Sequence, residues 1–240
     1  MRCSMKSTLI YNDIEIVDLA LKIKDHLVLG DLQIGFEEML NKKGILIPRQ
    51  RIESVIERID AILKNVRVKT IVFNGDLKHE FGIISRQEWR DITRLLEHLV
   101  LKGYELIIVK GNHDVVLGPI VKKLNLKIVD YYTVGNITIL HGDKIIPDLA
   151  DVIIIGHEHP AISFHERKDE RYKCFLVGTW HKKKLIVMPS FNTVTVGSDI
   201  SKENVLSPFL KQSLKNFDVY IVEDKVYKFG KVKDIVKESS

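Results

Sequence analysis

The chain has 240 residues, of which 45% are hydrophobic and 29% charged, and its formal net charge is +5. This length and apolar content suit one sizeable core and exclude a collagen-like or disordered chain, and no apolar run is long enough to cross a membrane. Cys3 and Cys174 give no disulfide framework, and the first residues lack the apolar segment of a secretory signal, so we expect one domain over residues 1–240 in the cytoplasm.

The first quarter of the chain predicts a hairpin, a central strand and a helix. Thr8–Tyr11 and Ile14–Val17 alternate apolar residues around an Asn-Asp turn, which is typical of a hairpin. The apolar run His26–Gly30 predicts the first central strand. Pro48 is a suitable first helical residue, and apolar residues recur every three or four positions from there to Val66, so we expect a helix over 48–66.

A strand, a helix and a second strand follow in the middle of the chain. Thr70–Asn74 and Glu105–Val109 are short apolar runs of the kind found in buried strands. Between them, Ser85 and Glu88 form the signature of a capping box, and the apolar stripe that follows stops at Gly103. Strand, helix and strand at this spacing predict a right-handed parallel crossover.

Shorter elements fill the rest of the chain. A helical segment is expected over 117–124, and the last third is expected to be mainly antiparallel β-structure. The expected strands are Lys127–Val129, Ile137–Leu140, Val152–Ile155, Cys174–Val177, Leu185–Met188, Thr193–Val196, Val219–Val222 and Val226–Phe229.

Short polar clusters follow five of the apolar runs, where ligands bind in open α/β sheets. The clusters are Gly30-Asp31, Gly75-Asp76, Gly111-Asn112-His113-Asp114, His141-Gly142 and Gly156-His157-Glu158-His159. A single Gly-Asp pair is usually only a turn. Together the clusters offer carboxylate, amide and imidazole ligands, which suit Mn²⁺, Fe²⁺ or Zn²⁺ better than Mg²⁺. If the strands lie side by side, these ligands fit two ions about 3.5–4 Å apart, with Asp76 as the bridge.

The segments GDLQIGFE, GDLKHE, GNHD, HGD and GHEH resemble, in order and spacing, the calcineurin-like metallophosphoesterases over nearly the whole chain. GDLQIGFEEMLNKKGILIP and LIVMPSFN further resemble the prokaryotic branch that is encoded beside DNA ligases and helicases and is related to double-strand-break repair nucleases. The resemblance implies a four-layer αββα sandwich of two mixed β-sheets flanked by helices. It also implies a functional link to a DNA helicase or ligase.

The same resemblance assigns roles to individual residues. It implies that one metal is held by Asp31, Gln33, Asp76 and His159, and the other by Asp76, Asn112, His141 and His157. His113 would be the catalytic acid. In the repair nucleases a His three residues after the bridging Asp orients the catalytic His, and His79 occupies that offset here.

One position departs from the family pattern. The first motif is usually Asp-x-His, whereas this chain has Asp31-Leu32-Gln33, a variant that some branches use. A Gln carbonyl is a neutral and harder ligand than imidazole, so the first metal should bind less tightly and the site should favour Mn²⁺. We therefore expect two divalent ions, with Mn²⁺ in first place and Fe, Zn or Ni as alternatives.

The reaction expected from these residues is hydrolysis of a phosphate ester. A metal-activated water would attack phosphorus in line, and His113 would protonate the leaving group. The resemblance favours a phosphodiester, such as the end of single-stranded DNA or RNA. The net charge agrees with a polyanionic substrate, although it equally serves solubility. Two alternatives stay open: a nucleotide diphosphate hydrolase, where the Asp-x-Gln variant also occurs, and a non-catalytic scaffold that has kept the fold and lost the metals.

Overall fold

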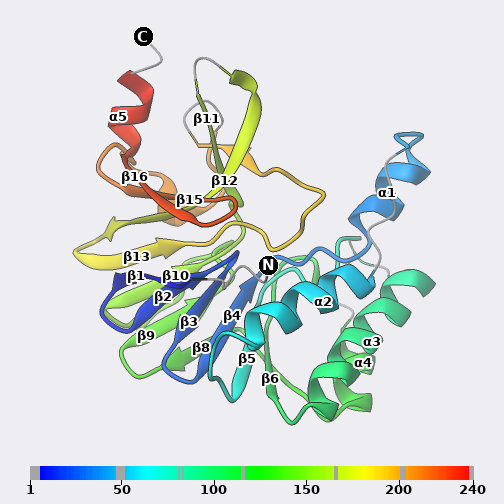
Figure 1. Cartoon of the computed structure of the whole chain (residues 1–240). Helices are drawn as coiled ribbons and strands as arrows, with labels where there is room; N and C mark the ends of the chain where they lie inside the picture. The colour runs from blue at the N-terminus through cyan, green and yellow to red at the C-terminus, as the bar shows by residue number, and fades with distance from the viewer. Residues whose placement is uncertain are drawn as a thin grey trace.

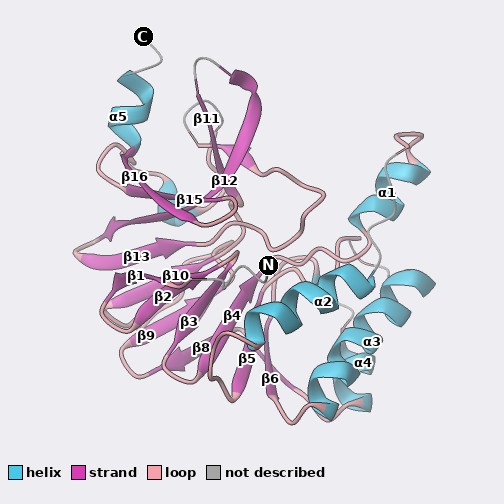
Figure 2. Cartoon of the chain, in the orientation of Figure 1, coloured by secondary structure: helices cyan, strands magenta, loops and turns pink. Residues whose placement is uncertain are grey.

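The chain folds into two β-sheets that pack against each other, with the longest helices gathered on one side (Figure 1). The computed structural model describes residues 6–46, 52–80, 82, 84–114, 117–164, 167–200 and 204–237. Figure 2 shows that strands make up most of the two central layers and that helices lie outside them. This arrangement confirms the predicted fold class of two mixed sheets with flanking helices.

The first sheet is antiparallel in its first half and parallel in its second. Its order is β1 (Thr8–Tyr11), β2 (Ile14–Val17), β3 (Ala20–Ile23), β4 (His26–Gly30), β5 (Thr70–Asn74), β6 (Glu105–Val109) and β7 (Lys127–Val129). Two-residue turns join the first four strands, which forces antiparallel pairing, whereas helical segments join the last four and allow parallel pairing. The carboxyl ends of β4, β5 and β6 therefore share one edge.

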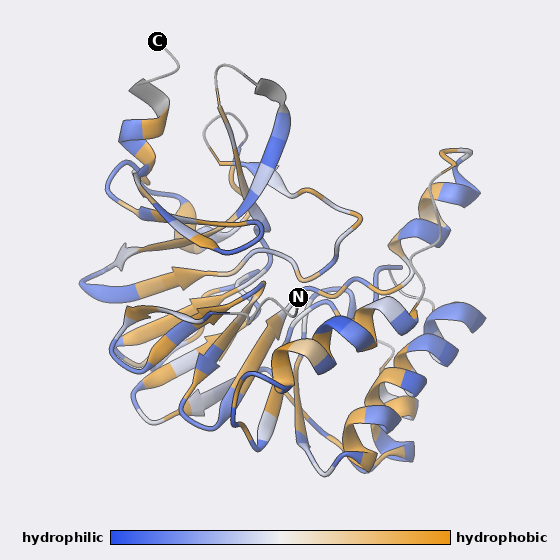
Figure 3. Cartoon of the chain, viewed as in Figure 1, coloured by the Kyte–Doolittle hydropathy of each residue, from blue (hydrophilic) through white to orange (hydrophobic). Residues whose placement is uncertain are grey.

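Among the described residues, four helices follow the strands of the parallel half: α1 (Phe36–Lys42) and α2 (Ile52–Leu63) after β4, α3 (Arg86–Leu101) after β5, and α4 (Gly118–Lys123) after β6. The longest of them are α2 and α3. The predicted capping box is present, because the Ser85 Oγ accepts a hydrogen bond from the Glu88 backbone N at 3.0 Å and Glu88 Oε2 accepts one from the Ser85 N at 2.8 Å. Figure 3 shows apolar and polar residues alternating along these helices. The buried residues of α2 recur at three- and four-residue intervals, which fixes the face that it turns to the core.

The second sheet combines parallel and antiparallel strands. Its strands are β8 (Tyr131–Val134), β9 (Ile137–Leu140), β10 (Val152–Ile155), β11 (Pro160–Phe164), β12 (Arg167–Trp180), β13 (Lys183–Val187), β14 (Ser198–Asp199), β15 (Asp218–Val222) and β16 (Val226–Lys231). At its centre, β10 pairs in parallel with both β9 and β13. The carboxyl ends of β9 and β10 therefore lie next to each other.

The side chains of the second sheet alternate between two hydrophobic clusters. On β10, Ile154 belongs to the core between the sheets, whereas Ile153 and Ile155 belong to a second cluster on the opposite face. That second cluster contains residues of the 3₁₀ turn η2 (Pro208–Leu210) and of α5 (Val232–Lys237), which supply the short helical part of the outer layer. Period-two alternation thus places β10 between two apolar layers.

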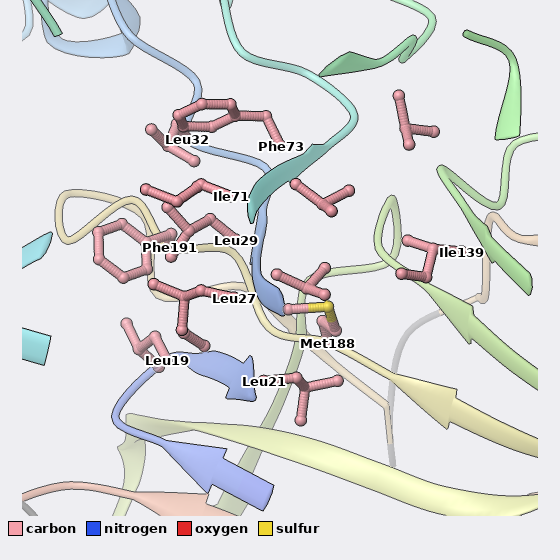
Figure 4. Packing of buried hydrophobic residues seen from close by; sticks show 14 of the residues in the cluster. Leu19, Leu21, Leu27, Leu29, Leu32, Ile71, Phe73, Ile139, Met188 and Phe191 are labelled. Atoms are coloured by element: carbon pink, nitrogen blue, oxygen red, sulfur yellow. The ribbon is translucent and has the colours of Figure 1, made fainter. Parts of the chain in front are cut away.

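The core between the sheets is built from side chains of both (Figure 4). Leu27, Leu29 and Phe73 come from the first sheet, and Ile139 comes from the second; each is fully buried. Met188, which follows β13, fills the space between them. The two sheets are therefore held in one relative position, which fixes the loops at their common edge.

The structure corrects several details of the sequence prediction. Thr193–Val196 is not a strand, because Asn192 Oδ1 accepts the backbone N–H groups of Val194 at 2.7 Å and Thr195 at 3.2 Å and so turns the chain. The helix expected to run to Val66 ends at Leu63, and its expected start at Pro48 lies outside the described residues. Every helix among the described residues is too short or too polar to serve as a membrane span.

Candidate metal centre

The loops after five strands bring the predicted ligands to one edge of the two sheets. Asp31 follows β4, Asp76 follows β5, Asn112 follows β6, His141 follows β9 and His157 follows β10. Segments that are 126 residues apart in sequence meet here, since the His157 backbone N donates a hydrogen bond to Asp31 Oδ2 at 3.0 Å. The predicted convergence of the five clusters is therefore present in the structure.

His141 lies at the middle of this group. Its Nε2 is 3.0 Å from His157 Nδ1 and 2.8 Å from Asn112 Oδ1. The same nitrogen is 3.6 Å from Asp76 Oδ2, and the other ring nitrogen is 3.4 Å from Asp31 Oδ1. Asp76, His141 and His157 each offer a ligand atom, and these atoms all lie within 4.8 Å of one another. Such a cluster has the size and donor types of a metal site.

Gln33 and His159 adjoin the carboxylate of Asp31. His159 Nε2 is 3.5 Å from Asp31 Oδ1 and 3.5 Å from Gln33 Nε2. Flipping the Gln33 carboxamide about its last C–C bond exchanges its oxygen with its nitrogen, so the oxygen can occupy the position of Nε2. The carboxamide of Gln33 therefore lies beside His159, and all the predicted ligands belong to one cluster.

Two buried polar atoms in the cluster have no hydrogen-bond partner among the described residues: Asp31 Oδ1 and His141 Nδ1. Buried polar atoms are nearly always satisfied, so an orphaned carboxylate oxygen facing an orphaned ring nitrogen needs an explanation. A divalent cation held by the carboxylate accounts for Asp31 Oδ1, because carboxylate oxygens are among the usual ligands of such ions. The residues present therefore fit a metal of the Mn²⁺, Fe²⁺ or Zn²⁺ type.

The electrostatics of the cluster lead to the same conclusion. Burial, together with the nearby charge of Asp31, raises the pKa of Asp76 to about 8. Burial opposes ionisation of Asp31 as well, but the imidazoles of His159 and His141 outweigh it and lower the pKa of that carboxyl. Burial lowers the pKa of His141 to about 4 and also lowers the pKa of His157. Neutral imidazoles are the form that binds metals, and a bound cation would allow Asp76 to ionise beside Asp31.

His113 is held by one hydrogen bond from its backbone and one from its ring. Its backbone N donates to Asp76 Oδ1 at 3.0 Å, and its Nδ1–H donates to the main-chain carbonyl of His79. A carbonyl only accepts, so this bond fixes the proton on Nδ1 and leaves Nε2 on the side of Asp76, 3.7 Å from Oδ2. The imidazole of His113 is thus aimed at the cluster.

His79 contacts His113 through its carbonyl and through its ring. The two rings stack with centroids 5.6 Å apart, and Phe36 packs edge-on against His79 at 4.7 Å. Burial, and then the proximity of His113, lowers the pKa of His79 to about 4. The Nδ1 of His79 has no hydrogen-bond partner among the residues described. A role for the His79 imidazole in orienting His113 stays a prediction, because the observed hydrogen bond uses the main chain.

The backbone at the ligands is strained. Five of the candidate ligands have left-handed φ angles: Asp31 (49°), Gln33 (46°), Asp76 (35°), His157 (64°) and His159 (50°). Each such residue costs on the order of 1–3 kcal/mol and persists only where the surroundings hold it. The cluster therefore needs supports, and these supports are the residues that sequence reasoning missed.

Two buried carboxylates support the loops on the side of Asp76. Asp114 accepts hydrogen bonds from the backbone N of Leu77 at 3.0 Å and of Gly111 at 3.0 Å, so it ties the second loop to the third. Glu88, besides capping its helix, accepts from the backbone N of His79 at 3.2 Å. Asp114 follows the predicted catalytic His113 in the sequence, but its carboxylate accepts hydrogen bonds from backbone N–H groups.

Asn192 and Glu158 support the remaining loops. The Nδ2 of Asn192 donates to the carbonyl of Leu32 at 3.1 Å and to that of Gln33 at 3.2 Å across 159 residues of sequence. Glu158 lies between the two histidines of its motif, yet its Oε2 accepts from the backbone N of Ser207 at 2.9 Å. The segment LIVMPSFN, noted in the sequence, thus ends on the residue that holds the first ligand loop.

Replacing Gly111 with Ala is expected to displace Asp76, because the added Cβ would overlap both the backbone nitrogen and Oδ1 of that residue. Overpacking of this kind typically costs about 1–3 kcal/mol of unfolding free energy, which urea denaturation would measure. Gly118→Ala is the matched control, since a Cβ there meets nothing within 4 Å and the residue lies in a helix. Equal stability of the two variants would contradict the close approach at Gly111.

The chain resembles known proteins in its fold and in its sequence profile. Pseudomonas putida nuclease MPE has the same fold, with a TM-score of 0.67 and 17% identity over 89% of this chain and 94% of that one. A protein of unknown function from Aquifex aeolicus aligns at 21% identity over 56% of this chain and 78% of that one, with a TM-score of 0.37. No curated protein sequence matches the chain. The profile of the calcineurin-like phosphoesterases matches residues 26–149, just over half of the sequence. The chain therefore belongs to the calcineurin-like phosphoesterase family and is a metal-dependent phosphoesterase.

Proposed function

We propose that this protein hydrolyses phosphodiesters at a pair of divalent cations bridged by Asp76. The observation that carries the proposal is the meeting of Asp76, His141 and His157, whose ligand atoms lie within 4.8 Å of one another beside the buried carboxylate of Asp31. Membership of a family of metal-dependent phosphoesterases supports the reaction class. A scaffold that had lost its metals would have no reason to keep these buried, mutually repelling carboxylates.

Each cation has its own ligand set in this proposal. One is held by Asp31, Gln33, Asp76 and His159, and the other by Asp76, Asn112, His141 and His157. The neutral amides of Gln33 and Asn112 and the neutral imidazoles contribute no negative charge, so two carboxylates serve two divalent cations and the centre keeps a net positive charge for an anionic phosphate. We propose Mn²⁺ as the native metal, with Fe, Zn and Ni as the alternatives to be compared.

The residues around the cations orient the substrate and move a proton. When bound, the cations neutralise the phosphoryl oxygens and polarise a water for in-line attack on phosphorus. The carbonyl of His79 holds Nδ1 of His113, so that the proton to be transferred is on Nε2. Burial lowers the pKa of His113, which makes its protonated form a stronger acid than free imidazolium. His113 therefore donates this proton to the departing alkoxide oxygen as a general acid.

A strand end of single-stranded nucleic acid is the substrate that we propose within the phosphodiester class. The sequence resembles the branch associated with DNA ligases and helicases, and the similarly folded Pseudomonas putida protein is a nuclease. The net charge of +5 suits a polyanion, and Phe36 offers an aromatic ring next to His79 on which a base can stack.

A hydrolysis screen tests this function. Mn²⁺-loaded protein is incubated with bis-aryl phosphate, aryl monophosphate, single-stranded DNA and nucleotide diphosphates, with chelator as the blank. We expect turnover of the bis-aryl phosphate and of DNA, and a steep fall of the DNA reaction with salt. Faster hydrolysis of nucleotide diphosphates than of DNA would contradict the proposed substrate. Absence of bound metal after Mn²⁺ loading would favour a non-catalytic scaffold.

Replacing Gln33 with His is expected to tighten metal binding at the first site. Imidazole is the better ligand for transition metals, so we expect about tenfold higher affinity for the weaker of two Mn²⁺ ions and a larger gain for Zn²⁺. Calorimetric titration of the metal-free protein would measure both affinities. Equal affinities of wild type and variant at both sites would show that residue 33 is not a ligand.

A further inference from the structure

The ammonium group of Lys173, on β12, is bonded to a single loop of the protein. It donates to the carbonyl and the hydroxyl of Ser190, both at 2.7 Å, and to the carbonyl of Asn192. These three acceptors match the three N–H groups of an ammonium, so its donors are used within the protein. Hydrogen bonds from a charged donor are about twice as strong as neutral ones. The ammonium group therefore anchors this loop.

The anchored loop belongs to a segment that holds two of the metal ligands. We call residues 190–198 the clamp segment. Its Asn192 Nδ2 donates to the carbonyl of Gln33 at 3.2 Å, and the backbone N of Ser198 donates to the carbonyl of His159 at 3.0 Å. Gln33 and His159 belong to the proposed ligands of one cation, which we call the first metal site. One segment thus contacts both ends of that site.

Both ligands held by the clamp segment have strained backbones. The φ angles of Gln33 and His159 are 46° and 50°, a conformation that persists only where the surroundings hold it. Gly197 of the clamp segment has a φ of 97° and passes so close to His159 that a Cβ there would overlap its carbonyl oxygen. A displacement of the clamp segment would therefore move both ligands.

The second metal site has different supports. The loop of His141 is held at Gly142, whose carbonyl accepts a hydrogen bond from the Ser207 hydroxyl at 2.7 Å. The loop of Asn112 is held by Asp114, whose Oδ2 accepts from the backbone N of the preceding glycine at 3.0 Å. These supports do not depend on the ammonium group that anchors the clamp segment. A change at that group should therefore reach the first site and spare the second.

We propose that Lys173 is a positioning residue that sets the affinity of the first metal site through the clamp segment. The division of the ligands into two sites rests on the proposed function. Loss of the ammonium group releases the main chain of Asn192, and Gln33 and His159 then lose their common anchor. The expected effect is selective weakening of one cation, whereas a merely structural lysine would affect both cations or neither.

The positioning is tested on metal-free protein by amide hydrogen exchange. Lys173→Met keeps the length of the side chain and removes its donors. The amides of Gln33 and Ser198 both donate to main-chain carbonyls and should exchange about tenfold faster in the variant. The amide of Gly156, which donates to the carbonyl of His141 at the second site, should stay within about twofold. Burial, and then the charge of Arg58, lowers the pKa of Lys173 to about 7, so exchange is measured at about pH 6, where the ammonium keeps its third proton.

Two further variants sharpen the exchange experiment. Lys183→Met is the matched control, because Lys183 lies on the neighbouring strand β13 and its ammonium group donates to the carbonyl of Leu149 at 2.7 Å. It should leave all three amides unchanged. Ser190→Ala removes one acceptor of Lys173 and should speed the same two amides by a smaller factor, even if Lys173→Met does not fold. Equal acceleration of all three amides, or acceleration of none, would overturn the positioning role.

The effect on the metals is tested by calorimetric titration with Mn²⁺. Lys173→Met should raise the dissociation constant of the weaker ion about tenfold and leave that of the tighter ion within about twofold. Asn192→Ala should do the same, and the two effects should not add in the double variant, because both act through one contact. Equal weakening of both ions, or additive effects, would overturn the proposal. A wild type that binds a single ion or cleaves no phosphodiester would instead contradict the proposed function, and the exchange result at Gln33 would be unaffected.

Discussion

Replacing Asp76 with Asn is expected to lower the rate of hydrolysis by at least about 10³-fold. A neutral carboxamide cannot replace the negatively charged carboxylate between two cations, and the stabilisation of the transition state by those cations is worth several kcal/mol. Asp76 Oδ2 faces His141 and His113 at 3.6 and 3.7 Å, so its loss affects the whole cluster. Steady-state rates with Mn²⁺ and bis-aryl phosphate measure the effect. Asp130→Asn, at an exposed surface pair with Lys144, is the control. Near-normal activity of Asp76→Asn would exclude Asp76 as the bridge.

The same Asp76→Asn substitution should increase the stability of the metal-free protein. The pKa of Asp76 is raised to about 8 by burial and by Asp31, so the folded state favours its protonated form. The stability that this group contributes is present at low pH and is lost as pH rises from about 4 towards 8. Asn does not ionise, so the unfolding free energy of the variant should rise relative to that of the wild type over that pH range. Urea unfolding in the presence of chelator would measure both. A difference in unfolding free energy between the two proteins that is constant with pH would contradict the raised pKa of Asp76.

Replacing His113 with Ala is expected to lower turnover by about 10²–10⁴-fold on single-stranded DNA while metal content stays intact. The reason is that an alkoxide leaving group needs the proton from Nε2. An aryl leaving group departs without such help, so the loss should be much smaller for a bis-nitrophenyl phosphate. Rates on the two substrates and metal analysis of the purified variant measure these effects.

His98→Ala is the matched control for His113→Ala, because His98 lies on α3 and is hydrogen-bonded to Asp60 at 3.1 Å, away from the cluster. It should leave both rates and metal content unchanged. Loss of metal from His113→Ala would reassign His113 from acid to ligand or loop support. Equal losses on the alkyl and aryl substrates would mean that it does not protonate the leaving group.

The strands that position the site were predictable because their physical signal is local. Thr70–Asn74 and Glu105–Val109 are apolar runs between polar turns, and both form strands within those bounds. The helix α1 (Phe36–Lys42) was not predicted, since it begins after Gly35 at a φ of 96° and has no side-chain cap. Thr193–Val196 failed as a strand because the carboxamide of Asn192 captures the backbone donors that a sheet would need.

The chemistry of the site was more predictable than its supports. Ligand types and their order along the chain indicate a metal centre, because carboxylate and imidazole after buried strands have few other uses. The hydrogen bonds that hold Leu32 and Gln33 come from Asn192, and a contact over such a sequence separation leaves no local pattern. The carbonyl of His79 gives no signal either, since any residue type has one.

Electron paramagnetic resonance of the Mn²⁺-loaded protein, combined with metal analysis, tests the central claim most directly. The claim is that loops from both sheets jointly hold two cations with one carboxylate between them, at a separation of about 3.5–4 Å. It predicts two Mn²⁺ per chain with an exchange-coupled spectrum, which Asp76→Asn converts to the spectrum of isolated ions. One ion per chain, or two ions whose spectrum is uncoupled in the wild type, would contradict it.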